Sequence, residues 1–490
     1  MSLEKIVEII HSSDDKNWKK RNEEALEPVF GAPHGRYPVA AKQLIQLRAP
    51  DMGFESGVPF AAYIHPNNPK SGPYGGFSFV IFPSPDEPAL FGLVVGTQGL
   101  APDEAILGRP GHARKAQAIC AWLNHEYGNG SLIAWAKQDP TRTDISVPEN
   151  VQANWGGFKK AFDSYGHVMY ALYKPSSDRD ATRQALTAML DVMFEDRGSR
   201  PNAQHRANWD QIRSKWFDYL MPRLDDKQVK DLLKQKHFVV IQGPPGTGKT
   251  RMAQEILADA YNGAGQSVQL HPNTTYETFI GGLAPEHSQE SLGLRFQPKQ
   301  GFLMQAAQEA LKIQPQPYLL HIDEINRADL SKILGEAIYL LEANDLQKRE
   351  INLAYDFGPP FHTKFKIPEN LHILGTMNTA DRSIAIVDVA VRRRFAFASL
   401  WPQMSVVKAK GCELMQKAYQ EITDIFIEHA QDDAFNLIPG HSYFLEQDDE
   451  KARVSLGVGL VPLLEEYLAQ GYIGGFSEQV RSYLQWVRSL

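Results

Sequence analysis

The chain has 490 residues and a formal net charge of −7 at pH 7. Hydrophobic residues make up 43% of it and charged residues 22%, which excludes the disordered and fibrous classes and is typical of a globular protein. The mildly acidic total argues against a surface that is basic throughout, although it leaves room for a local basic groove that binds nucleic acid. The length exceeds what one hydrophobic core organises, so we expect two or three domains.

The cysteines and the N-terminus indicate where the protein works. Only two cysteines occur, Cys120 and Cys412, far apart and without the spacing of metal ligands, which favours a reducing compartment. The first ten residues mix acidic with apolar side chains and predict an amphipathic helix, not a secretory signal. No apolar run approaches the length of a membrane span. We expect a cytoplasmic protein without membrane contact.

Residues 1–175 are rich in glycine, proline and aromatic side chains. Strand-like runs at 77–82 and 90–95, and the helical spacing of apolar residues at 113–123, predict an N-terminal α+β domain over residues 1–175. A further helical pattern and the polar stretch 197–205 follow, which predicts a helical linker over 176–208.

From residue 209 strands alternate with helices, as in a parallel sheet covered on both faces. Buried-type strands are predicted at 237–242, 318–322 and 371–377, and an amphipathic helix at 330–341. After Trp401-Pro402 the strands cease, and 406–429 and 461–468 are predicted helices. We therefore predict an α/β core over 209–402 and a C-terminal helical lid over 403–490.

A phosphate-binding loop follows the first of these strands. The motif G-x-x-x-x-G-K-[ST] is formed by Gly243, Pro244, Pro245, Gly246, Thr247, Gly248, Lys249 and Thr250. Its glycines let backbone N–H groups converge on phosphate oxygens, and the helix that follows adds a favourable dipole. Lys249 is predicted to reach the β- and γ-phosphates, and the Thr250 hydroxyl to bind Mg²⁺.

Two carboxylates end the strand at 318–322. Asp323 and Glu324 lie where doubly wound sheets bind ligands, so Asp323 is the predicted magnesium partner. Glu324 is the candidate that orients and polarises the attacking water. The alternative is that this acidic pair is a helix cap.

The third strand ends in an amide, and charged residues follow it. Asn378 can hydrogen-bond the attacking water or the γ-phosphate. Further charges that could reach the nucleotide of a neighbouring subunit are Asp381, Arg382, Arg392, Arg393 and Arg394. For each arginine alone, a solvated face or a salt bridge is an equally good interpretation.

These motifs resemble those of the AAA+ family, and within it the McrB-like NTPases of modification-dependent restriction systems. The similarity rests on the stretches 321–327, 377–383, 392–395, 440–444 and 462–467 and covers roughly residues 209–475. It implies a ring, by analogy a hexamer, with Asn378 as first sensor and an arginine finger within Arg392–Arg394. It also implies hydrolysis of GTP or ATP with Mg²⁺, and a McrC-like nuclease subunit as partner. The loop contacts phosphates and not the base, so the preference between GTP and ATP stays open.

The N-terminal half resembles modules of McrB-like proteins, some of which bind DNA and accommodate a flipped modified base. Tyr63, Tyr74, Phe77 and Trp122 could stack on a base, although core positions are the alternative for most of them. The cations around 108–115 could hold phosphate at a helix start, or form a solvated helix end.

Three functions remain open from the sequence. The first is the motor and DNA-recognition subunit of a restriction or anti-phage defence complex. The second is a MoxR-like remodelling chaperone that acts on protein clients. The third is a sensor whose N-terminal domain binds a ligand and whose NTPase serves as a switch.

Overall fold

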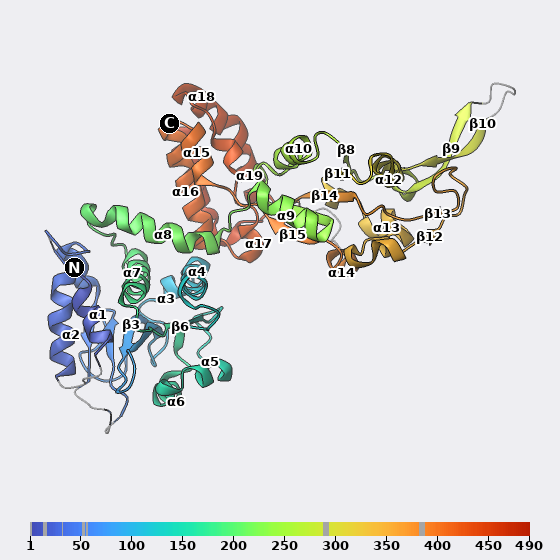
Figure 1. Ribbon diagram of the computed structural model, residues 1–490. Helices are drawn as coiled ribbons and strands as arrows, with labels where there is room; N and C mark the ends of the chain where they lie inside the picture. Colours follow the sequence, from blue (N-terminus) through green and yellow to red (C-terminus); the bar gives the residue numbers. More distant parts are fainter. Residues whose placement is uncertain are drawn as a thin grey trace. The chain divides into compact units, whose positions relative to one another are not determined.

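The computed structural model describes residues 2–12, 17–31, 33–50, 54, 57–287, 294–381 and 388–490. The chain divides into two compact units: Met1–Met221 with Ile427–Gln431, and Pro222–Phe426 with Asp432–Leu490. Figure 1 labels many of the helices and strands of each unit. The predicted boundaries at 175, 208 and 402 stay predictions.

A six-stranded antiparallel sheet forms the centre of the first unit (Figure 1). Its strands, in spatial order, are β1 (Gln46–Arg48), β2 (Ala61–Ile64), β3 (Phe77–Phe82), β4 (Leu90–Val95), β6 (Met169–Tyr173) and β5 (Ala134–Ala136). Its helices are α1 (Glu4–Ile10), α2 (Trp18–Leu26), α3 (Glu104–Leu107), α4 (Pro110–Tyr127), α5 (Glu149–Asn154), α6 (Lys159–Tyr165), α7 (Arg179–Asp196) and α8 (Arg206–Leu220).

Both faces of this sheet are buried along its four central strands, β2, β3, β4 and β6. Successive side chains of a strand point to opposite faces, and along β3 Phe77 and Phe79 join one apolar cluster while Val80 and Phe82 join the other. The first cluster includes residues of α1, α4 and α7, and the second includes residues of α5 and α6. The strands predicted at 77–82 and 90–95 are confirmed as β3 and β4.

A five-stranded parallel sheet forms the centre of the second unit. In spatial order its strands are β15 (Ala396–Ser399), β7 (Phe238–Gly243), β14 (Leu371–Asn378), β11 (Tyr318–Asp323) and β8 (Gly265–Gln269). The helices around it are α9 (Asp226–Lys236), α10 (Lys249–Ala260), α11 (Tyr276–Phe279), α12 (Phe302–Ile313), α13 (Leu330–Leu334) and α14 (Val389–Arg392). Two antiparallel hairpins accompany it, β9 (Gly281–His287) with β10 (Leu294–Gln300) and β12 (Ile351–Asn352) with β13 (Lys364–Phe365).

Apolar clusters cover both faces of the parallel sheet as well. Val239 and Ile241 of β7 pack with α9 and α10, whereas Phe238 and Val240 pack with α12 and α13. A strand that is buried on both faces needs a continuous apolar run, and this is the pattern that made β7, β11 and β14 visible in the sequence. The fold of this unit is the predicted AAA+ α/β module with a parallel sheet.

The lid contains helices and, between residues 404 and 490, no strand. These helices are α15 (Met404–Lys410), α16 (Glu413–His429), α17 (Asp432–Phe435), α18 (Asp449–Ser455), α19 (Val461–Ala469) and α20 (Ser477–Ser489). The prediction of a single helix over 406–429 is wrong. The segment forms two helices, α15 and α16, with Gly411-Cys412 between them.

The helix predicted over 330–341 is wrong too. Helix α13 ends at Leu334, and Gly335 takes the left-handed conformation with φ +50 before a 3-10 turn covers Gly335–Leu340. Glycine adopts this conformation at little cost, and a Cβ at Gly335 would lie 3.1 Å from the ring of Tyr276. The apolar spacing survives the break, since Ala337 and Leu340 are still buried.

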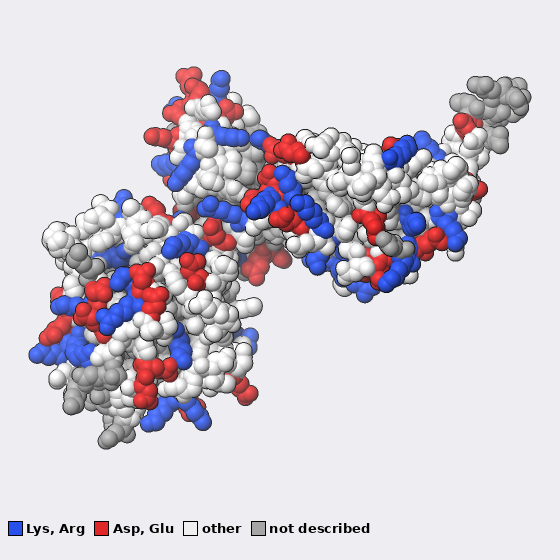
Figure 2. All heavy atoms as spheres, viewed as in Figure 1, with Lys and Arg blue, Asp and Glu red and all other residues white. Residues whose placement is uncertain are grey.

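The surface charge and the hydropathy of the helices match what the composition of the sequence indicates. Acidic and basic side chains intermingle over the face of the molecule shown in Figure 2. Among the described residues, no helix combines the length and the apolar character needed to cross a bilayer.

Candidate nucleotide-binding site

The carboxyl ends of three neighbouring parallel strands bring the predicted site residues together. Strand β14 lies between β7 and β11, and Asn378 pairs in register with Gly243. A cleft of about 310 Å³ lies at this edge of the sheet. Its lining residues are Pro245, Gly246, Gly248, Lys249, Thr250, Arg251, Asp323, Glu324, Thr376, Met377, Asn378 and Ser442.

The loop between β7 and α10 has the backbone shape that exposes N–H groups. Gly246 has φ +75 and Gly248 has φ +83, conformations that favour glycine. Helix α10 begins at Lys249, and no side chain caps its N-terminus at Gly248. Its first N–H groups and the positive end of its dipole are therefore suited to an anion.

Lys249 is folded back onto its own loop. Its Nζ donates to the carbonyl oxygens of Gly243 at 2.9 Å and Pro244 at 2.7 Å. Burial lowers the pKa of Lys249 to about 8, and the nearby carboxylates of Glu324 and Asp323 oppose this shift. An incoming polyphosphate offers oxygens that can replace both carbonyls.

Oxygen atoms suited to Mg²⁺ meet at Asp323. The Thr250 Oγ1 donates to Asp323 Oδ1 at 2.9 Å, and Thr376 Oγ1 donates to the same oxygen. Hydroxyl and carboxylate oxygens are the ligands that Mg²⁺ prefers, with phosphate oxygens and waters completing its shell, so Thr250 and Asp323 fit this ion. Within the described residues no cluster of three or more His, Cys, Asp or Glu offers another metal site.

Glu324 is held in an uncommon backbone conformation with an unsatisfied carboxylate. Its φ is +52, which is rare outside glycine and clusters at functional sites. Its Oε2 is buried without a hydrogen-bond partner, and Arg327 Nε lies 3.6 Å away. Burial raises the pKa of Glu324; Arg327 opposes the rise, and Asp323 adds to it. This oxygen can accept a hydrogen bond from a water molecule.

Asn378 lines the cleft at the end of β14. Its Oδ1 accepts from the N–H of Ala380 at 3.1 Å, and its own carbonyl oxygen accepts from Asn326 Nδ2 at 3.3 Å. These contacts fix the side chain and the backbone at the point where the strand ends.

Of the predicted charges beyond Asn378, those that the structure describes do not line this cleft. Asp381 lies 3.5 Å from Arg327 Nη2, and Arg382 falls outside the described residues. Arg392 and Arg393 are exposed. The half-buried Arg394 donates from Nη1 to the carbonyl oxygen of Ala390 at 2.6 Å, within its own turn.

Three residues of the site were not singled out from the sequence. Thr376 stands inside an apolar strand and binds Asp323. Arg327 joins Glu324 and Asp381 by ion pairs. Ser442 comes from the lid, about 200 residues away along the chain. The spacing of Thr376 two residues before Asn378 places both on one side of β14 and could have suggested Thr376, whereas Arg327 and Ser442 lie within the stretches 321–327 and 440–444 without a role that the sequence assigns to them.

A second candidate site lies in the first unit. A pocket of about 290 Å³ is lined by Phe60, Gly72, Pro73, Tyr74, Val80, Phe82, Val94, Val95, Thr97, Tyr165 and Val168. The ring of Tyr165 lies 5.9 Å from both Phe60 and Phe82, measured between centroids. The described lining of the pocket is therefore rich in aromatic side chains and includes no charged residue, which suits a flat, uncharged ligand.

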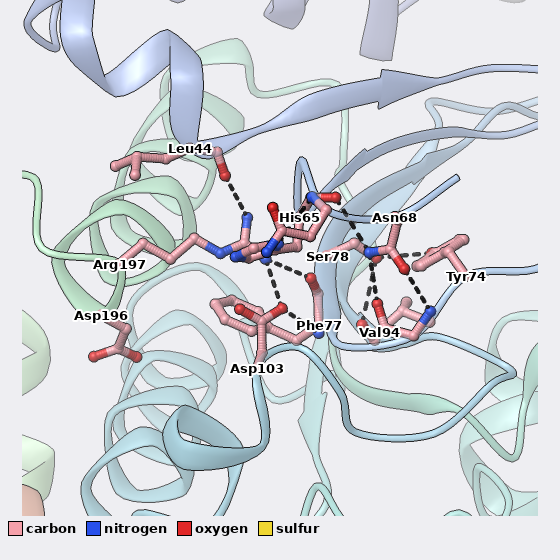
Figure 3. Close-up of polar contacts among 12 residues, drawn as sticks. Leu44, His65, Asn68, Tyr74, Phe77, Ser78, Val94, Asp103, Asp196 and Arg197 are labelled. Carbon is pink, nitrogen blue, oxygen red and sulfur yellow. Dashed lines mark hydrogen bonds and ion pairs between the residues drawn. The ribbon is translucent and has the colours of Figure 1, made fainter. Parts of the chain in front are cut away.

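The loop that forms the rim of this pocket is tied down by polar contacts (Figure 3). Asn68 donates from Nδ2 to the carbonyl oxygen of Gly75 at 2.9 Å and accepts from the Gly75 N–H at 3.0 Å. The hydroxyls of Tyr74 and Ser78 lie 2.8 Å apart. Arg197 and Asp103 form a buried ion pair of 2.9 Å beside this loop. These contacts hold the rim of the pocket in place.

Most of the aromatic residues that the sequence suggests for stacking on a base lie in the hydrophobic core. Tyr63, Phe77 and Trp122 are at most 2% exposed, and Tyr74 alone of the four lines the pocket. Two of the cations at the start of α4 are also engaged: Lys115 is buried and pairs with Asp196, and Arg109 Nη1 lies 4.0 Å from Glu428 Oε2. A phosphate site at that helix start is not supported.

The sequence matches one protein family and is similar to two restriction-enzyme components. Residues 238–395 match the AAA domain family (dynein-related subfamily). The chain is 31% identical over 357 residues to the type IV methyl-directed restriction enzyme EcoKMcrB subunit of Escherichia coli, covering 66% of this chain and 74% of that protein. It is 26% identical over 196 residues to the type II restriction enzyme BsuMI component YdiS of Bacillus subtilis, covering 33% of this chain and 56% of that protein.

Proposed function

The chain belongs to the McrB-like AAA+ proteins, and on this basis we propose that it is the NTP-hydrolysing motor and DNA-recognition subunit of a restriction or anti-phage defence complex. The observation that carries the proposal is the single cleft where the phosphate-binding loop, Asp323, Glu324 and Asn378 meet. The substrate is GTP or ATP, since the residues of the cleft are suited to phosphates and leave the base undefined.

Each side chain then has a role set by its position. Lys249 exchanges its two loop carbonyls for phosphate oxygens of the nucleotide. Thr250 and Asp323 would hold Mg²⁺, which supplies charge neutralisation to the phosphates when bound. Glu324 accepts a hydrogen bond from the attacking water through its unsatisfied oxygen, and Asn378 helps to position that water or the γ-phosphate.

The exposed arginines belong to a neighbour's site in this proposal. Arg392 and Arg393 lie on the surface, where a second copy can reach them. One of Arg392, Arg393 and Arg394 would act as the finger in a ring, by analogy a hexamer, and Asp381 and Arg382 would support the same interface.

The first unit would supply recognition of the DNA. Its aromatic pocket suits a flipped, modified base, because a flipped base is read by stacking between aromatic and apolar side chains. We further propose a McrC-like nuclease subunit as partner and a cytoplasmic location, in keeping with the restriction-enzyme subunits to which the chain is similar.

Hydrolysis assays test the proposal directly. Release of phosphate from ATP and from GTP is measured for the full chain alone, with unmodified duplex DNA, with cytosine-methylated duplex DNA, and with the candidate nuclease added. We expect turnover of at least one nucleotide, and a change in rate with modified DNA. Absence of turnover under every condition would refute the NTPase, whereas turnover that ignores DNA would refute only the restriction role.

A further inference from the structure

A short lid segment lies directly on the phosphate-binding loop. The N–H groups of Gly440 and Ser442 donate to the carbonyl oxygens of Pro245 at 2.9 Å and Gly246 at 3.0 Å. The contact is too close for a side chain, since a Cβ at Gly440 would lie 2.1 Å from Gly246 backbone atoms. Farther along, Phe444 is fully buried and its ring lies 5.3 Å from that of Tyr419. The segment 440–444 is thus fixed at both ends.

His441 is held within this segment with a defined tautomer. Its Nδ1 accepts from the backbone N–H of Gln403 at 3.3 Å, so the proton of the neutral ring is on Nε2. Burial lowers the pKa of His441 to about 4, and the cations Lys410 and Arg251 add to the shift, so the ring is neutral at pH 7.

The Nε2 atom of His441 faces the start of α10. It lies 3.7 Å from the position that a Cβ on Gly248 would occupy, and it is the atom of a distant segment that comes nearest to that position. Gly248 lines the cleft and precedes the first helical residue, Lys249. The Nε2 atom therefore lies beside the first N–H groups of α10, which are suited to phosphate.

We infer that His441 is a nucleotide-binding residue that donates one neutral hydrogen bond, through Nε2–H, to the phosphate groups held at the N-terminus of α10. The inference rests on the proposed NTPase function. Among the described residues that line the cleft, the cations are Lys249 and Arg251, both of α10, and the lid contributes Ser442, the neighbour of His441 in the chain. The inference therefore assigns to a neutral imidazole the position from which a lid side chain reaches the phosphates.

Two substitutions separate this role from a structural one. In His441→Asn the side-chain oxygen can still accept from Gln403 N–H, but the donor at the Nε2 position is lost. In His441→Gln an amide N–H can reach the Nε2 position, but the acceptor for Gln403 is lost. We expect His441→Asn to weaken binding of both ATP and GTP by about tenfold or more, as for loss of a hydrogen bond to a charged group, and His441→Gln to retain most of the affinity.

Dissociation constants for ATP and GTP, together with thermal unfolding midpoints, are measured on the full chain and both variants. Equal affinity of His441→Asn and the unchanged protein overturns the inference, as does a loss confined to one nucleotide, which would place the donor at the base. A loss in His441→Gln alone would indicate a structural role and also overturn it. If the unchanged protein binds neither nucleotide, the proposed function itself fails.

Discussion

The contact between the lid and the phosphate-binding loop predicts a large local effect from one added methyl group. In Gly440→Ala the new Cβ would lie 2.1 Å from the carbonyl carbon and oxygen of Gly246 and 2.4 Å from the Pro245 oxygen. Restoring a normal separation of about 3.5 Å requires the segment to move by roughly 1.4 Å. That movement stretches the bonds from the N–H groups of Gly440 and Ser442, now 2.9 Å and 3.0 Å long, beyond hydrogen-bond range.

Loss of two hydrogen bonds at about 1 kcal/mol each makes opening of the segment easier by about 2 kcal/mol, or roughly 30-fold. Hydrogen exchange followed by mass spectrometry reports this as lost protection at the Ser442 amide. Gly457→Ala is the matched control in the lid, because a Cβ there meets nothing within 4 Å, and it should leave this protection unchanged. Unchanged exchange at residue 442 in Gly440→Ala would refute the reasoning.

Three further outcomes follow from single side chains. Glu324→Gln should bind ATP or GTP normally and hydrolyse it at least about 100-fold more slowly, and retained turnover would remove Glu324 from its role. Asp191→Asn should destabilise the first unit by about 3–5 kcal/mol in denaturant unfolding, since Arg36 would keep a buried charge without its 2.5 Å partner, and an unshifted transition would contradict this. Burial raises the pKa of Cys120 to about 12, so only about one Cys120 thiol in ten thousand is ionised at pH 8; in the native protein Cys120 should resist iodoacetamide while the half-buried Cys412 serves as the reference thiol, and mass spectrometry of the Cys120 peptide should show labelling rising only toward pH 12.

The parts of the site that are local in sequence could be predicted from it. The loop 243–250 carries its own motif, and the apolar runs before Asp323 and Asn378 identify strands whose ends must meet in a parallel sheet. Strand β8 was not visible because its residues, Gly265–Gln269, are partly exposed and mostly polar, so no apolar run marks them.

The contacts between distant segments could not be predicted in this way. Thr376 has no local signature that pairs it with Asp323, and Ser442 approaches Gly246 only after the lid has folded. Around Gly335 the apolar spacing correctly predicts which side chains are buried, but it does not predict the backbone. Periodicity shows which face of a segment is buried and does not detect a left-handed residue that interrupts the helix.

The distribution of positive charge favours a site completed by a second copy. A phosphoryl-transfer site must compensate the charge on the transferred group, and arginines commonly do so. Among the described residues that line the cleft, the positive groups are Lys249 and Arg251, the latter paired with Glu255 at 2.7 Å. Arg392 and Arg393 are exposed beside Val389, which is 77% exposed. An interface would bury such an exposed apolar side chain together with two cations, one on the short helix α14 and one directly after it. A neighbouring copy in the proposed ring could therefore bring these cations to the cleft.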